Sequence, residues 1–359
     1  MYNLIQLGWN EFFQNQFQIF KEQNFNPGRI AVENKQRYIL YTVAGELPGE
    51  VTGKLLYSSE VAELPKTGDW VAAVFFEDEK KAIIHSVLER RNKLSRKVAD
   101  RKTEEQVIAA NVDYVFIVQS LDNNFNIKRL ERYIVSAFES NIEPVIVLNK
   151  IDLTSESLLR KEEVMLRFSN VWVILTNAIT GSGIDEIKNI LSEGKTGVFT
   201  GSSGVGKSTI INYLMGETII QTSKISSSVN KGKHTTTRRE LLIIPNGGIV
   251  IDTPGMREFQ LWNVDKGMDQ AFDEIELFSL NCKFSDCTHT KETGCAVLEA
   301  LNMGTIDEAK LQSYYKLQKE LRYLEEKQDK NAFLKRKERE KKLHKEIKRF
   351  FKTGKDKRM

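Results

Sequence analysis

The first 90 residues alternate apolar and polar side chains in short runs that Gly, Pro and Asp separate. A period of two predicts half-buried β-strands, and five such runs in succession predict a small all-β barrel. The five-stranded oligonucleotide-binding (OB) barrel and an SH3-like barrel fit this spacing equally. The expected strands are Arg29–Glu33, Arg37–Thr42, Val51–Leu56, Asp69–Phe76 and Lys81–Val87.

From Asp113 onward, wholly apolar runs alternate with stretches of helical periodicity. Apolar strands between helices indicate a parallel sheet that is covered on both faces, the architecture of an α/β domain. Strands are expected at Tyr114–Val118, Val145–Leu148, Val171–Leu175, Val198–Thr200, Leu241–Ile244 and Ile249–Ile251. Helices are expected near Ile127–Ser140, Ser155–Phe168, Ile184–Leu191 and Lys207–Met215.

Beyond Trp262 the sheet pattern ends, and a segment rich in Cys and His precedes a helical pattern. Apolar residues recur there at three- and four-residue steps, which predicts an amphipathic helix; they are Leu311, Tyr314, Leu317, Leu321 and Leu324. The chain is therefore expected to divide into a barrel (1–90), a basic linker (91–112), an α/β domain (113–262), a helical domain with the Cys/His segment (263–330) and a basic helical tail (331–359).

Charge is unevenly distributed along the 359 residues, whose net charge is +4. Residues 331–359 hold 13 Lys or Arg and 4 Asp or Glu, a net charge of +9, so the preceding residues carry −5. Such a tail suits a polyanionic partner, but a solvated extension that merely keeps the protein soluble explains it equally well. No apolar run approaches the ~20 residues of a membrane span, and no secretory signal is evident. A cytoplasmic monomer without a membrane partner is expected.

A phosphate-binding loop is predicted between the strand at Val198–Thr200 and the helix at Lys207. The run fits G-x-x-x-x-G-K-[ST] in its required setting of strand, loop and helix. Glycines allow the backbone N–H groups to point at phosphate, the lysine reaches the outer phosphates, and the serine places a hydroxyl on Mg²⁺. The expected ligands are Gly201, Ser202, Ser203, Gly204, Val205, Gly206, Lys207, Ser208 and Thr209.

A guanine-reading motif precedes this loop, because a buried strand runs directly into Asn149-Lys150-Ile151-Asp152. The Asp152 carboxylate can accept hydrogen bonds from both N1 and the exocyclic amine of guanine, a pair of donors that adenine lacks. Asn149 can contact the base N7, and Lys150 can lay its aliphatic stem over the ring. The loop Thr176–Ile179 follows the next strand and is expected to offer the Ala178 amide to guanine O6, although Asn177-Ala178 matches the usual Ser-Ala-Lys only loosely.

Two switch segments are predicted after the phosphate loop. Asp252-Thr-Pro-Gly255 fits D-x-x-G, in which Asp252 would hold Mg²⁺ through water and the Gly255 amide would sense the γ-phosphate. Thr236 is the favoured switch threonine for Mg²⁺, although spacing does not separate it from its neighbours. Met256 stands where many GTPases carry a water-orienting Gln, so slow intrinsic hydrolysis is expected. His234 is the candidate for positioning the water, and a solvated loop histidine is the equal alternative.

The order of these motifs is unusual, because the base motif comes first and the phosphate loop follows it. Most GTPases run from phosphate loop through the switches to N-K-x-D, so a circularly permuted GTPase domain is predicted. Whatever follows residue 262 is then tethered to the γ-phosphate sensor, and the nucleotide state can bias it directly.

All three cysteines and one of the four histidines lie within fourteen residues, as Cys282-x4-Cys287-x-His289-x5-Cys295. Four such ligands suit a tetrahedral Zn²⁺ ion and fill its coordination shell, so a structural zinc is predicted.

Together these features resemble the ribosome small-subunit-dependent GTPase A family (RsgA, also called YjeQ). The resemblance spans the whole chain and includes the segment 105–113 and the run Lys231–Thr237. It implies that the barrel is of the OB type and that the protein binds GTP and GDP. It also implies a late step in 30S subunit maturation, GTP hydrolysis that the subunit stimulates, and binding to 16S rRNA.

Two alternatives remain open at this point. A permuted GTPase of large-subunit assembly would carry the same motifs in the α/β domain, although the barrel and the zinc site argue against it. A nucleotide-gated RNA-binding module without significant turnover would also fit, since Met256 cannot orient water.

Overall fold

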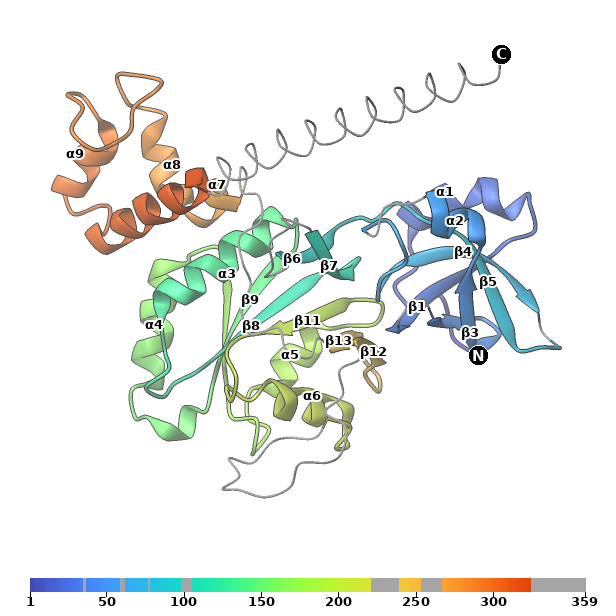
Figure 1. Cartoon of the computed structure of the whole chain (residues 1–359). Coiled ribbons are helices and arrows are strands. Elements are labelled where there is room, and N and C mark those ends of the chain that lie inside the picture. The colour runs from blue at the N-terminus through green and yellow to red at the C-terminus, as the bar shows by residue number, and fades with distance from the viewer. Residues whose placement is uncertain are drawn as a thin grey trace, which may run out of the picture.

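The computed structural model describes residues 1–34, 37–58, 62–76, 78–97, 105–220, 239–252 and 267–323. It contains an N-terminal barrel, a central α/β domain and a C-terminal helical region (Figure 1). This confirms the predicted multidomain architecture. None of the helices in the described ranges has the length and apolar character needed to cross a membrane.

The barrel closes with five strands in the order β1-β2-β3-β5-β4, because β4 also pairs with β1. Its parallel β3–β5 pair, and a helix between β3 and β4, give the Greek-key arrangement of an OB-type barrel. Ile30, Leu40 and Ile84 fill the interior and are fully buried. The strands are β1 (Asn26–Asn34), β2 (Arg37–Thr42), β3 (Gly45–Val51), β4 (Trp70–Phe76) and β5 (Lys81–Val87).

One predicted strand is wrong, and two helices of this domain were not expected. The third strand is β3, and most of the predicted strand Val51–Leu56 forms helix α2 (Gly53–Ser58) instead. Helix α1 (Glu11–Lys21) begins at the N-cap Asn10 and buries Phe13 and Phe17 beside Trp70. Packing against the aromatic core therefore stabilises α1.

The described parts of the predicted linker, residues 91–97 and 105–112, include two paired strands. Strands β6 (Lys93–Lys97) and β7 (Glu105–Ala110) pair antiparallel as a separate two-stranded sheet. Leu94 and Ala109 are fully buried in this pair, so apolar packing stabilises a segment that composition alone marks as basic.

The α/β domain contains six strands in the order β10-β9-β8-β11-β13-β12. All neighbours are parallel except β12, which runs antiparallel to β13 and corrects the expectation of a wholly parallel sheet. The strands are β8 (Tyr114–Ser120), β9 (Glu143–Asn149), β10 (Trp172–Thr176), β11 (Thr196–Thr200), β12 (Arg239–Ile243) and β13 (Ile249–Asp252).

Helices cover both faces of this sheet, as predicted (Figure 1). One face carries α3 (Ile127–Glu139) and α4 (Ser157–Arg167), and the other carries α5 (Ile184–Ile190) and α6 (Lys207–Met215). The two buried clusters follow the alternation along β8: Val115 and Ile117 pack on the α3 side, whereas Phe116 and Val118 pack on the α6 side.

The barrel and the α/β domain share one continuous sheet of eleven strands, because β1 pairs antiparallel with β12 at Val32–Glu240 and Glu33–Arg239. Arg29 strengthens the junction, because its guanidinium donates to the Thr196 hydroxyl at 2.9 Å and to the Asn111 carbonyl at 3.3 Å. Burial lowers the pKa of Arg29 to about 10, so the side chain stays charged at neutral pH.

The C-terminal region starts with α7 (Gly267–Ala271), α8 (Asp273–Ser279) and α9 (Ala296–Asn302), and residues 308–323 are helical. It rests on α3, where Gly267 donates its amide to the Glu139 carboxylate at 2.9 Å. The predicted amphipathic face is confirmed as far as the described residues extend, since Leu311, Tyr314, Leu317 and Leu321 are buried; Leu324 lies outside them.

Candidate nucleotide site and metal centre

The predicted phosphate loop joins the end of β11 to the start of α6. Gly201, Gly204 and Gly206 have φ angles of 137°, 80° and 104°, a region that L side chains rarely adopt. A Cβ on Gly206 would lie 2.2 Å from Asn149 Nδ2. Glycine is therefore required for the chain to curl here and for Asn149 to approach it.

Lys207 begins helix α6 and folds back over the loop. Its ammonium donates to the carbonyls of Gly201 at 2.8 Å and Ser202 at 2.7 Å. The charge is thereby held above the loop, at the positive end of the helix, where an anion would bind. Ser208 and Thr209 follow in the first turn and are half-buried.

Asn149 connects the base motif to the phosphate loop. It ends β9, is 1% exposed, and donates through Nδ2 to the Val205 carbonyl at 2.8 Å. Its Oδ1 accepts from the Thr176 hydroxyl at 3.0 Å and from the Ala178 amide at 3.1 Å. These contacts bring together three predicted site segments that lie far apart along the chain.

The Ala178 amide, expected to contact guanine O6, is thus already engaged with Asn149. A base contact from this amide would have to share that donor.

Asp152 is held by Asn177, which the sequence analysis named only as a loose match to the usual loop and did not include among the site residues. It lies in the 3₁₀ helix η1 (Ile151–Leu153), and its Oδ1 accepts from Asn177 Nδ2 at 3.0 Å. Asn177 also accepts the amide of Ile179 at 3.0 Å, which fixes its own orientation. The sequence contained a signal for this role, because the Asn177 amide, like the serine hydroxyl of the usual Ser-Ala-Lys loop, offers a hydrogen-bond donor at this position.

Lys150 is positioned by a second residue that was not predicted. It adopts a left-handed conformation, with φ of 63°, and its ammonium lies 3.3 Å from Asp122 Oδ2. Partial burial raises the pKa of Asp122, but hydrogen bonds from the Asn124 amide, the Ser120 hydroxyl and Lys150 outweigh it, so the net pKa is lowered. Asp122 therefore stays ionised and holds Lys150 at neutral pH.

Arg129, also not predicted, reaches the phosphate loop from the first turn of α3. Its Nη1 donates to the Ser202 hydroxyl at 2.6 Å and to Asn124 Oδ1 at 3.1 Å. The loop after β8 and the first turn of α3 therefore contact both halves of the site, through Asp122 at the base motif and through Arg129 at the phosphate loop.

The residues expected to bind Mg²⁺ are only partly described. Asp252 ends β13, whose parallel partner β11 leads into the phosphate loop, so Asp252 and Ser208 lie at the same edge of the sheet. An oxygen from each is the kind of ligand that Mg²⁺ prefers. The predictions for His234, Thr236, Gly255 and Met256 lie outside the described residues, as does the basic tail.

The Cys/His segment brings its four predicted ligands into one cluster. Their donor atoms all lie within 4.8 Å of one another. The Cys282 and Cys295 sulfurs are 3.8 Å apart and lie 3.6 and 3.4 Å from His289 Nδ1. A tetrahedral ion with Zn–S bonds of about 2.3 Å and a Zn–N bond of about 2.0 Å requires an S–S separation of about 3.8 Å and an S–N separation of about 3.5 Å.

The surroundings hold this cluster in place. His289 has a left-handed backbone, with φ of 58°, and its carbonyl accepts a hydrogen bond from the Tyr315 hydroxyl. Cys295 is 2% exposed and caps the start of α9. The four residues can hold a metal ion, and the spacing of Cys282, His289 and Cys295 fits zinc.

Comparison with protein families gives two matches. The model of the family described as "RsgA GTPase" matches residues 87–262. The model described as "50S ribosome-binding GTPase" matches residues 196–337.

Curated relatives resemble the chain over nearly its full length. The "Small ribosomal subunit biogenesis GTPase RsgA" of Opitutus terrae is 44% identical over 89% of this chain and 90% of the relative. The protein of the same name from Methanosarcina acetivorans is 38% identical over 97% of this chain and 94% of its own.

Solved structures share the fold. YjeQ from Thermotoga maritima is 29% identical, with a TM-score of 0.64 over 83% of this chain and 98% of that protein. YloQ, whose structure is described as "a circularly permuted GTPase", gives a TM-score of 0.63 at 24% identity over 83% and 96%. The architecture described above, with its base motif ahead of its phosphate loop, is therefore shared with known proteins.

Proposed function

The chain belongs to the RsgA GTPase family, and on this premise we propose that it is a GTPase that acts on the small (30S) ribosomal subunit during its assembly. The observation that carries the proposal is the bond from Asn149 to the Val205 carbonyl, at 2.8 Å. It joins a guanine-reading motif to a phosphate loop, which is what a guanine nucleotide requires.

Base recognition is assigned to Asn149, Lys150, Ile151, Asp152 and Ala178. Asp152 accepts from N1 and the exocyclic amine of guanine, and Asn177 orients its carboxylate through the 3.0 Å bond. A nucleotide without those donors would leave the carboxylate unpaired, at a cost of about 1–3 kcal/mol. GTP and GDP are therefore the proposed ligands.

Phosphate binding is assigned to residues 201–209. The backbone amides of the loop and the Lys207 ammonium neutralise the phosphates, as in other P-loop enzymes. Ser208, Thr236 and Asp252 would hold Mg²⁺, which supplies charge neutralisation between the outer phosphates when it is bound. Gly255 would sense the γ-phosphate, and His234 is the proposed residue that positions water, since Met256 cannot.

The remaining domains are assigned to RNA. The barrel (1–90), the zinc domain (263–330) and the tail (331–359, net charge +9) would contact 16S rRNA, while residues 91–112 connect the barrel to the GTPase domain (113–262). Zinc would serve as a structural ion held by Cys282, Cys287, His289 and Cys295. We further propose that the protein acts as a cytoplasmic monomer.

The test is GTP turnover by the purified chain alone, with 30S subunits and with 50S subunits, at fixed Mg²⁺ and salt. Stimulation by 30S only is expected. The second candidate function is large-subunit assembly, which the match of residues 196–337 to the 50S ribosome-binding GTPase model supports. Stimulation by 50S subunits only would favour it. Binding of GTP without stimulation by either subunit would leave a nucleotide-gated RNA-binding module.

A base-specific variant completes the experiment. Asp152→Asn replaces the acceptor by an amide that can donate to the C2 carbonyl of xanthine. Its preference should therefore move from GTP toward XTP in the same assay. Unchanged preference for GTP would refute the assignment of Asp152.

A further inference from the structure

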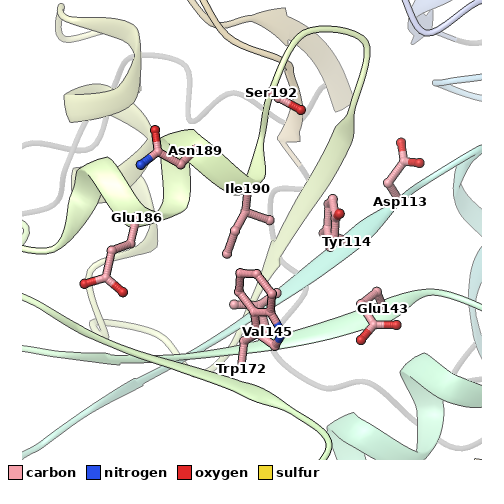
Figure 2. A pocket seen from close by; sticks show the side chains of 9 residues that line it. All are labelled: Asp113, Tyr114, Glu143, Val145, Trp172, Glu186, Asn189, Ile190 and Ser192. Atoms are coloured by element: carbon pink, nitrogen blue, oxygen red, sulfur yellow. The ribbon is translucent and has the colours of Figure 1, made fainter.

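A groove of about 700 Å³ lies at the end of the α/β sheet opposite the nucleotide site. Its residues come from the starts of β8, β9 and β10 and from the end of α5, whereas the phosphate loop follows the carboxyl end of β11 (Figure 2). The groove is therefore separate from the GTPase machinery. Its volume lies in the range of sites that hold small molecules or several side chains.

The floor of this groove is apolar and aromatic. Trp172 pairs in register with Val145, so the two side chains lie together on the face of the sheet that α5 covers. Tyr114 and Ile190 complete the floor. Trp172 is 64% exposed and belongs to β10, the last strand of the sheet. A large aromatic side chain in such a position is typical of an interface anchor.

The rim of the groove is acidic. Glu143 and Glu186 lie on opposite sides of Trp172, and Asp113 stands beyond Tyr114 (Figure 2). Among the described residues Asp113 pairs with Arg91 at 2.9 Å and with Lys195 at 3.7 Å. No ion pair within the described part of the chain involves Glu143 or Glu186, and no described residue that lines the groove is a cation.

This combination selects the occupant. The carboxylates of Glu143 and Glu186 repel the phosphates of RNA, whereas Asp113 is already paired with Arg91 and Lys195, so the groove does not suit rRNA. A guanidinium or ammonium group, in contrast, can stack on an indole and pair with flanking carboxylates at once. Burial also raises the pKa of Glu143, and a cation beside it would offset the desolvation that makes its ionised form less favourable.

We propose that the groove is a docking site for an arginine- or lysine-rich segment of a partner protein, with one cationic side chain seated on Trp172 between Glu143 and Glu186. The inference rests on the proposed function in one respect: the partner is expected among the basic proteins exposed on the small subunit. It gives the GTPase domain a protein contact, while the basic parts of the chain would face RNA.

The test measures binding of fluorescently labelled hexa-arginine to the full-length protein by anisotropy at physiological salt. The variants are Trp172→Ala and the double variant Glu143→Gln/Glu186→Gln. Glu162→Gln, an exposed glutamate on α4 outside the groove, is the matched control. Circular dichroism and basal GTP turnover should stay unchanged in all variants, because none of these residues belongs to the nucleotide site.

Both groove variants should weaken peptide binding about tenfold or more, and the control should bind as the wild type does. Equal binding by all variants would reveal only general attraction between charges and would overturn the proposal. Absence of binding by the wild type would overturn it too, as would variant-dependent binding of labelled hexa-glutamate.

A parallel titration with 30S subunits keeps the two hypotheses apart. The groove variants should need more subunit for half-maximal GTPase stimulation. If 30S subunits fail to stimulate even the wild type, the proposed function falls while the peptide result stands. If subunits stimulate all variants alike and the peptide does not bind, only the groove assignment falls.

Discussion

Arg129 and Ser202 are 73 residues apart in the chain, yet Arg129 Nη1 lies 2.6 Å from the Ser202 hydroxyl. Lys207 holds the carbonyl of the same serine at 2.7 Å. Two cations therefore hydrogen-bond to Ser202 of the phosphate loop, Arg129 through its hydroxyl and Lys207 through its backbone carbonyl.

Loss of the Arg129 contact should weaken nucleotide binding. Arg129→Ala should raise the Kd for GDP about three- to tenfold, since a hydrogen bond to a charged group contributes about 1.5–3 kcal/mol and partial exposure reduces that figure. Titration with a fluorescent GDP analogue measures it, with the exposed neighbour Lys128→Ala as the control for charge. In a double-mutant cycle, Ser202→Ala should have little effect once Arg129 is removed. Fully additive effects would contradict a direct coupling.

Asn177 should matter for base selectivity more than for phosphate affinity. Asn177→Ala removes the donor that orients Asp152 at 3.0 Å, so the ratio of Kd values for IDP and GDP should fall several-fold. IDP lacks the exocyclic amine, so a misplaced carboxylate loses less with it. Asn189→Ala, an exposed asparagine on α5, serves as the control. An unchanged ratio would show that Asp152 needs no such support.

Asp122 should support nucleotide binding without introducing pH dependence near neutrality. Its pKa is lowered from 3.8, so its stabilising charge is fully present above that value and is lost only as the pH falls through the still lower folded-state pKa. The affinity for GDP should therefore show no step from this group between about pH 5 and 8.

Asp122→Asn should lower that affinity about two- to fivefold across the same pH range, because a partly exposed ion pair contributes about 0.5–1 kcal/mol. Asp185→Asn, at an exposed carboxylate on helix α5, is the control. A deficit that appears only at acidic pH would contradict the assignment.

The metal centre predicts a stoichiometry and a structural role. Elemental analysis of the purified wild type should find one zinc ion per chain. The Cys295→Ser variant should lose this ion, and its C-terminal region should become sensitive to protease. Metal binding to such sites contributes directly to folding. Ser285→Ala, in the same loop but outside the cluster, should retain one zinc per chain. Full zinc occupancy in the Cys295 variant would refute the ligand set.

The buried arginine at the domain junction should be essential for stability. Arg29 is 1% exposed, and its guanidinium donates to acceptors on both domains. Arg29→Met should lower the free energy of unfolding by about 3–5 kcal/mol, because it leaves several buried acceptors unpaired. Arg37→Met, an exposed arginine in the same barrel, should change it by less than about 0.5 kcal/mol. Urea denaturation measures both, and similar values would contradict the prediction.

The sequence predicted best where a feature is local. The predicted phosphate loop lies in nine consecutive residues between a strand and a helix, and the four residues of the Cys/His cluster lie within fourteen, so spacing alone indicated both. The helices and strands of the α/β domain were found because each buries a continuous apolar run or face. Helix α1 was missed although Phe13 and Phe17 stand four residues apart, since strand-like runs dominated that part of the chain.

Contacts between distant segments could not be predicted in this way. Nothing in the local pattern pairs Val32 with Glu240, or Arg129 with Ser202. Pro48 and two glycines make Gly45–Val51 a poor strand by local propensity, and pairing with β2 and β5 nevertheless stabilises it as one. Long-range pairing therefore decided the elements and the supporting residues that spacing left open.

The pairing of β1 with β12 constrains the distance between two surfaces of the protein. Because one sheet runs unbroken from the barrel to the nucleotide domain, the β1–β12 pairing constrains the separation between the barrel surface and the phosphate loop. A rigid body with two contact surfaces binds strongly only where both are met at once. If both surfaces contact the small subunit, as proposed, a subunit whose contact surfaces lie at another spacing would engage only one of them and would be bound weakly before GTP is hydrolysed.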